Sequence, residues 1–157
     1  MASRRDAADR APRSLPPGFA LATQLSGSVA GGFPGTADQL AMVYTRGRSI
    51  DDFRYPFTVY FGPAGARALA ATEERQGVPV DIGIDGAVAT YHDGWWAIGP
   101  GEDQRRFGRT TAIHWDRSNV HSITLHTATQ TIGVRGSRAS GVAFRDLLQA
   151  AKSLPGL

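Results

Sequence analysis

Four histidines have the most obvious capacity for chemistry in this chain: His92, His114, His121 and His126. Neutral imidazole nitrogens bind zinc and other metals, and histidine is a general acid or base near neutral pH. Alternation in the surrounding residues predicts that His114 and His126 share one face of a hairpin, roughly 13 Å apart at 3.3 Å per residue, with His121 on the other face beside Trp115. Metal–nitrogen bonds of about 2.0–2.1 Å cannot bridge that gap. We therefore expect no metal site, and a histidine-based metal-dependent enzyme is the third of three functional hypotheses.

Motifs for nucleophilic catalysis and phosphate binding are missing from the sequence. The segment Gly-Ser-Val-Ala-Gly at residues 27–31 has its serine in the wrong place for a nucleophile elbow. The segment Gly-Pro-Gly at residues 99–101 is short, and its proline lacks the amide that a phosphate cradle needs. Adjacent carboxylates at residues 51–52 and 73–74 diverge on any strand or helix, so neither pair is a ready acid–base couple. The sequence thus predicts no catalytic residue and no cofactor.

Aromatic residues near position 95 provide a candidate ligand-binding site. Trp95 and Trp96 are neighbours and therefore point to opposite faces of any strand. At least one indole then faces away from the core, where it can stack on a sugar or line an apolar groove unless a helix or loop covers it. A two-residue turn at residues 93–94 places Tyr91 opposite Trp96 and His92 opposite Trp95. We select Tyr91, His92, Trp95 and Trp96 as candidate ligand-binding residues.

The composition is that of one globular domain and excludes several classes of site. The chain has 157 residues, of which 41% are hydrophobic and 20% charged, and it contains no cysteine. Disulfide scaffolds, thiolate zinc sites and cysteine nucleophiles are therefore excluded. No apolar run reaches the roughly 20 residues of a membrane-spanning helix. The N-terminus lacks the apolar core of a secretory signal peptide.

The net charge of +3 is concentrated at the N-terminus. Four arginines and two aspartates lie within the first thirteen residues, so the rest of the chain carries only one net positive charge. A basic leader on a nearly neutral domain is not the one-sided patch that follows a phosphate backbone, and nucleic acid is not an expected partner. Residues 1–14 are polar and without periodicity, which predicts a disordered leader. Residues 15–157 are predicted to form a single domain.

Short strands are expected to dominate that domain, because nineteen glycines and nine prolines interrupt it often. One predicted hairpin joins residues 87–92 to residues 95–98. Another joins residues 110–115 to residues 120–129, pairing Trp115 with His121 and Ile113 with Ile123 so that the apolar residues share a face. Further strands are expected at residues 40–45, 55–61, 80–84 and 131–135, with a glycine- and serine-rich loop at residues 24–36.

Two helices complete the predicted elements. Residues 63–76 are mostly good helix formers, with Pro63 suited to the first position and Gly77 to the residue just past the end, which predicts a short surface helix. Near the C-terminus, Ser137 or Ser140 can cap a second helix. Apolar residues at spacings of three and four define its buried stripe: Phe144, Leu147, Leu148, Ala151 and Leu154.

These elements predict an α+β fold. We expect a curved antiparallel sheet of about six to eight strands, because a half-apolar sheet must bury one face against something. The C-terminal amphipathic helix is expected to pack on that face. The helix over residues 63–76 is expected to lie at the surface.

Several segments, taken in order, also carry a resemblance. Residues 15–19 read Leu-Pro-Pro-Gly-Phe, and the strand that follows ends in Val-Tyr-Thr at residues 43–45. Residues 80–86 read Val-Asp-Ile-Gly-Ile-Asp-Gly. The series ends with Ala-Ile-His-Trp at residues 112–115, the strand at residues 120–125 and the helix at residues 144–154. Together they resemble an extracytoplasmic C-terminal domain family of unassigned function, found in bacterial lipoproteins, membrane-anchored proteins and anti-sigma factors.

The resemblance covers most of residues 15–154 and implies a sensing or binding role outside the membrane, without catalysis. It supplies no catalytic or ligand residues to carry over. We therefore expect a non-enzymatic extracytoplasmic binding or sensor domain, whose partner is a protein or a small hydrophobic or glycan ligand. The alternative is a carbohydrate-binding module that uses Trp95 or Trp96 as its stacking platform.

Overall fold

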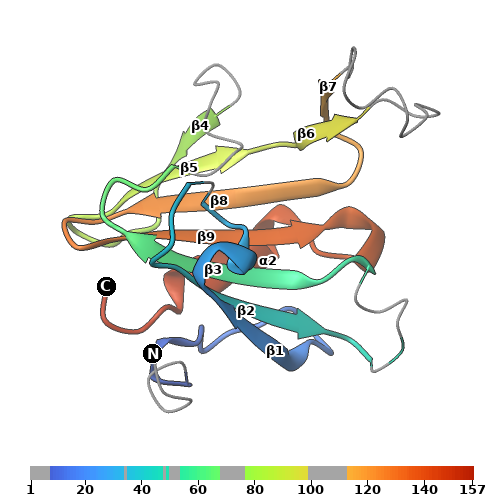
Figure 1. Ribbon diagram of the computed structural model, residues 1–157, viewed down its shortest axis with the longest axis horizontal. Coiled ribbons are helices and arrows are strands. Elements are labelled where there is room, and N and C mark those ends of the chain that lie inside the picture. The colour runs from blue at the N-terminus through green and yellow to red at the C-terminus, as the bar shows by residue number, and fades with distance from the viewer. Residues whose placement is uncertain (1–7, 34, 48, 50–53, 68–76, 99–112) are drawn as a thin grey trace.

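The computed structural model describes residues 8–33, 35–47, 49, 54–67, 77–98 and 113–157. In this part of the chain the main element is a seven-stranded sheet (Figure 1). From one edge to the other its strands are β1 (Ala20–Ser26), β2 (Leu40–Thr45), β3 (Phe57–Pro63), β9 (Gln130–Ser137), β8 (Val120–His126), β5 (Val88–His92) and β4 (Gly77–Val80). Every neighbouring pair runs antiparallel, as the alternating sequence predicted.

Two smaller elements accompany the sheet. Strands β6 (Trp95–Ile98) and β7 (Ile113–Asp116) form a separate two-stranded ribbon. Helix α2 (Phe144–Lys152) lies behind the sheet in the view of Figure 1 and packs against β8 and β9. The predicted antiparallel sheet with a C-terminal helix is thus confirmed. Within the described residues, no helix is long and apolar enough to cross a membrane.

The two faces of the sheet are covered differently. The helix face, which α2 covers, carries the main core, whose central members are Met42, Phe57, Val59, Ile123, Leu125, Ile132 and Val134. On the opposite face, Phe33 packs with Tyr60 and Ala66. Phe33 belongs to the segment between β1 and β2, which crosses in front of the sheet in Figure 1. We call this the loop face.

Helix α2 buries a stripe shifted from the predicted one. Leu147, Ala150, Ala151 and Leu154 are buried, whereas Phe144 is 39% exposed. The spacing of three and four is therefore retained, but the centre of the stripe moves to Leu147. The helix starts later than a serine cap would place it.

The capping of α2 corrects another prediction. Its N-cap is Ala143, whose N–H donates to Asp146 Oδ2 at 2.8 Å. Ser137 instead caps the short 3₁₀ helix η6 (Arg138–Ser140). Helix η6 and the turn after it span the residues between β9 and α2, so neither predicted serine lies at the N-terminus of α2.

Both predicted hairpins are wrong in their pairing. Strand β6 pairs with β7, placing Trp96 opposite Trp115, and does not fold back on β5. The reason is that β5 has no free edge, since β4 and β8 pair with its two sides. Strand β8 is likewise enclosed by β5 and β9, so His121 lies opposite Gly136 and not opposite Trp115. The chain bends at residue 93 and at residues 118–119, but neither bend closes the predicted hairpin.

Three other boundaries differ from the prediction. The expected loop at residues 24–36 begins inside β1, whose mostly exposed residues gave no apolar alternation. The expected strand at residues 80–84 overlaps β4 only at Val80. Pro63 ends β3 and does not begin a helix. The remainder of that predicted helix, residues 68–76, lies outside the described residues.

The segment before β1 lies against the C-terminal part of the fold. The backbone N–H of Arg13 donates to Ser153 O at 3.2 Å, and that of Ser14 donates to Ser153 Oγ at 2.9 Å. Ala11 and Leu15 pack against the main core. Residues 1–7 of the predicted leader lie outside the described part of the chain.

Candidate functional site

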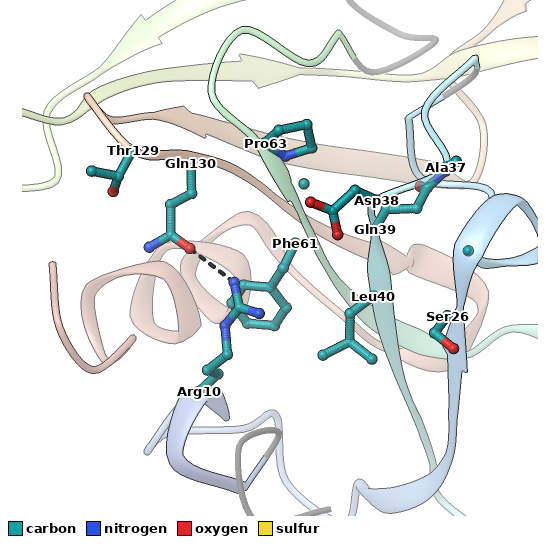
Figure 2. Close-up of a pocket in the computed structure, with 12 residues that line it drawn as sticks. Arg10, Ser26, Ala37, Asp38, Gln39, Leu40, Phe61, Pro63, Thr129 and Gln130 are labelled. Atoms are coloured by element: carbon teal, nitrogen blue, oxygen red, sulfur yellow. Dashed lines mark hydrogen bonds between the residues drawn. The ribbon is translucent and has the colours of Figure 1, made fainter. Parts of the chain in front are cut away.

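A cleft of about 420 Å³ opens at one end of the sheet (Figure 2). Because neighbouring strands are antiparallel, this end joins the last residue of β1, the first of β2, the last three of β3 and the first of β9. The segment before β1 contributes Arg10, and the segment before β2 contributes residues 37–39. The cleft therefore has sheet residues as its floor and two non-sheet segments as its walls.

Arg10 forms one wall, and its guanidinium group is held in place by two contacts. The guanidinium carbon lies 4.4 Å from the centroid of the Phe61 ring, a cation–π arrangement. Arg10 Nη2 donates to Gln130 Oε1 at 3.1 Å, the bond drawn in Figure 2. Phe61 is only 3% exposed, so the cation rests on a ring fixed in the core. The positive charge is thus positioned before any ligand arrives.

Asp38 forms the opposite wall. In Figure 2 its carboxylate points into the cleft from the side opposite Arg10. Next to it, the buried Gln39 fixes the backbone by accepting from Phe33 N at 3.0 Å and donating to Phe33 O at 3.1 Å and to Thr36 O. Within the described part of the chain, no hydrogen bond or ion pair involves the Asp38 carboxylate.

The cleft is equipped for binding by charge and hydrogen bonds. Besides Arg10 and Asp38, the cleft is lined by the apolar residues Leu40 and Phe61 and by the small residue Gly62. The remaining described lining residues supply hydroxyl, amide and backbone groups: Ser26, Gly27, Ala37, Gln39, Pro63, Thr129 and Gln130. Its described lining contains no histidine. A ligand here meets two opposite charges and an apolar floor.

The four residues selected from the sequence do not gather in this cleft. Tyr91 and His92 point to opposite faces of β5, since Tyr91 packs with the helix-face core and His92 lines a cavity on the loop face. Trp95 is 40% exposed in the ribbon. The side chain of Trp96 lies outside the described part of the structure.

Tyr91 belongs to a polar network at the edge of the helix face. Its hydroxyl lies 2.9 Å from His121 Nδ1 and accepts from Arg138 Nη2 at 3.2 Å. Arg138 also forms an ion pair with Asp93. The Tyr91 ring meets Phe144 edge-on, with 4.7 Å between centroids. The network therefore ties the end of β5 to η6 and to the start of α2.

The contacts of His121 define its tautomer. Its Nε2 lies 2.8 Å from the carbonyl oxygen of Val142, which can only accept, so Nε2 carries the proton. His121 Nδ1 then accepts from the Tyr91 hydroxyl. Burial lowers the pKa of His121. The neutral ring is fully occupied in holding β8 to the chain before α2.

His92 and His126 line a second cavity, of about 360 Å³, on the loop face. His92 is 2% exposed, and its Nδ1 has no hydrogen-bond partner among the residues that the structure describes. Burial lowers the pKa of His92, and the nearby His126 lowers it further. His126 Nδ1 lies 3.3 Å from Thr131 Oγ1. His114 belongs to the ribbon, and the described residues contain no group of three or more metal-ligating side chains.

The buried histidines predict a loss of stability in mild acid. Because the pKa of both His92 and His121 is lower in the folded protein than the ordinary 6.5, the unfolded chain binds protons first as the pH falls. Their contribution to the free energy of unfolding is complete above about pH 6.5 and is lost as the pH falls below that value. The free energy then decreases by at most about 1.4 kcal/mol per pH unit for each linked proton. Urea unfolding between pH 8 and pH 5 measures this slope. His121→Gln should reduce this slope and leave the share of His92 in place. Constant stability of the wild-type protein over that range would contradict the link between stability and the buried histidines.

The residues of the cleft carried no sequence signal that could have identified them. Arg10 lies in the predicted leader, Asp38 follows the predicted loop, and Gln130 immediately precedes a predicted strand. They converge because β3 pairs with β9, which brings Pro63 opposite Gln130. That pairing is long-range and is not visible in local patterns.

Comparison with known proteins assigns no family to the chain. No family model, no curated protein and no solved structure matches it. The function is therefore inferred from the geometry of the site.

Proposed function

We propose that this chain is a non-enzymatic binding domain whose small polar ligand occupies the cleft between Arg10 and Asp38. The observation that carries the proposal is the placement of two oppositely charged side chains on facing walls of one cleft without an ion pair between them. Its volume of about 420 Å³ falls within the usual range for small-molecule sites, roughly 300–1,000 Å³. The fixed guanidinium of Arg10 reduces the ordering cost of binding.

The origin of the two walls supports a sensing role. One wall belongs to the segment that precedes β1, and the other belongs to the segment that crosses the loop face. A ligand that contacts both segments favours the arrangement in which they approach each other, and so couples binding to the state of the chain before β1. The extracytoplasmic location belongs to this proposal and rests on the family resemblance.

The test is a ligand screen read out by two-dimensional NMR on labelled protein. A genuine ligand should shift the amide resonances of Gly27, Gly62 and Gln130, which line the cleft. Arg10→Gln should weaken that ligand about tenfold or more, since a hydrogen bond to a charged group is lost. Arg13→Gln removes an exposed arginine from the same segment and should leave the affinity unchanged. Shifts confined to another surface, or equal affinities in both variants, would refute the site.

A carbohydrate-binding module is the second candidate, and the exposure of Trp95 supports it. Trp95 is 40% exposed, which leaves part of its indole surface accessible for stacking on a sugar ring. Glycan-array binding that is lost in Trp95→Ala and retained in Arg10→Gln would favour this candidate over the cleft. Glycan binding retained in both Trp95→Ala and Trp96→Ala would exclude it.

A further inference from the structure

We propose that the ligand of the cleft is a zwitterion, a free amino acid or a short peptide with an unblocked amine and carboxylate. This inference rests on the proposed binding function and specifies its ligand class. In the assignment that we infer, the ligand carboxylate meets Arg10 and the ligand ammonium meets Asp38. The two side chains lie on facing walls, so the two ends of one molecule reach them together.

Arg10 is suited to a carboxylate. Its guanidinium group has five N–H donors in a planar fork, and Gln130 takes the bond from one of its nitrogens at 3.1 Å. The Phe61 ring holds the guanidinium plane from below without using those donors. Donors therefore remain for a carboxylate, which arginine binds through two parallel hydrogen bonds.

Asp38 supplies the complementary charge. Its carboxylate enters the cleft with no hydrogen bond or ion pair among the described residues, while its neighbour Gln39 anchors the backbone through three hydrogen bonds. The Asp38 carboxylate is thus carried by a segment whose backbone is fixed by hydrogen bonds, and its oxygens are available to accept hydrogen bonds from a ligand. An ammonium group has three donors and no acceptor, which matches a carboxylate.

The pair of opposite charges disfavours ligands that carry a charge of only one sign. An inorganic anion such as phosphate gains Arg10 but faces the charge of Asp38, and a simple cation faces Arg10 in the same way. A zwitterion is attracted at both ends. The apolar residues Leu40 and Phe61 also line the cleft and offer an apolar contact to the aliphatic part of an amino acid. A neutral sugar would leave both charges without an ionic partner.

The experiment uses one dipeptide and its two blocked forms. Wild-type protein is titrated by calorimetry with alanyl-alanine, with N-acetyl-alanyl-alanine, which lacks the ammonium, and with alanyl-alanine amide, which lacks the carboxylate. The free dipeptide should bind about tenfold or more tightly than either blocked form, because each block removes one charged contact. Inorganic phosphate alone should bind more weakly than the free dipeptide.

Two variants assign the ends of the ligand. Asp38→Asn should weaken the free dipeptide to the affinity of the acetylated form and leave the acetylated form unchanged. Arg10→Gln should do the same with respect to the amide form. Arg13→Gln and Asp85→Asn change exposed charges that do not line the cleft, and both should bind like wild type. Thermal unfolding of each variant shows that the fold is intact.

The outcomes separate the inference from the proposed function. Equal affinities for the free and blocked dipeptides would overturn the zwitterion assignment but leave a binding cleft in place. The zwitterion assignment would also be overturned if a compound of another class bound with an affinity that depends on Arg10 while no dipeptide bound. If the ligand screen yields no compound that depends on Arg10, the proposed function fails and the zwitterion assignment fails with it.

Discussion

Replacing Phe33 by alanine is expected to lower the free energy of unfolding by about 3–5 kcal/mol. Phe33 is fully buried, although it lies in the connection between β1 and β2. Its ring meets Tyr60 edge-on, with 6.4 Å between centroids, and occupies space that the absent side chain of Gly62 leaves open. A β-carbon at Gly62 would lie 2.6 Å from Phe33 Cδ2. The alanine variant therefore loses the apolar anchor of the whole connection.

The same substitution should weaken ligand binding, because the backbone of Phe33 accepts and donates the hydrogen bonds that hold Gln39 beside Asp38. Urea unfolding measures the loss of stability, and NMR titration of the folded variant measures the loss of affinity. Val29→Ala is the matched control, since Val29 lies in the same connection but is 71% exposed. A loss of less than about 1 kcal/mol for Phe33→Ala would contradict the anchoring role, since burial of a phenylalanine predicts more.

Strand propensity and helix periodicity predicted much of the fold. The strand over residues 40–45 is found with the expected bounds, and the segments around residues 57–61, 88–92 and 131–135 are strands as expected. Most apolar residues of these segments are buried, on both faces in β2, β3 and β9, so their composition records the packing directly. The C-terminal helix was predictable for the same reason, because Leu147, Ala151 and Leu154 are all buried.

Strand partners were not predictable, because pairing is a competition between edges. The turn at residues 93–94 favours a hairpin, but β4 and β8 already take both edges of β5, so β6 pairs with β7. Strand β1 escaped prediction for the opposite reason. Its residues are exposed on both faces, and its backbone pairing with β2 leaves no trace in the pattern.

The cleft shows the same limit at the level of function. Arg10 and Gln130 are 120 residues apart and share a hydrogen bond. Each is ordinary in its local context, and their proximity arises from the docking of the segment before β1 against the β8–β9 end of the sheet. The four residues selected from the sequence, in contrast, were chosen by type and by a predicted turn at residues 93–94, and β5 separates two of them onto opposite faces. Residue type suggested chemistry, whereas topology determines which side chains meet.

The sheet and the chain that leads into α2 approach each other closely at Gly136. A β-carbon there would lie 2.4 Å from Val142 Cγ1, 2.9 Å from Val142 Cβ and 3.3 Å from Leu147 Cδ2. Gly136→Ala is therefore expected to destabilise the protein by about 1–3 kcal/mol through overpacking. The carbonyl of Val142 also accepts from His121, so movement of this residue is resisted from a second side.

Gly133→Ala is the matched control, because Gly133 lies in the same strand on the other face of the sheet. Its nearest neighbour to an added β-carbon is Tyr60 Cδ2 at 3.6 Å, an ordinary contact, and the change in stability should stay within about 0.5 kcal/mol. In a Val142→Ala background, the effect of Gly136→Ala should shrink, since the atom at 2.4 Å is gone. Equal effects at Gly133 and Gly136, or an undiminished effect in that background, would show that β9 and the chain before α2 do not approach as closely as the structure places them.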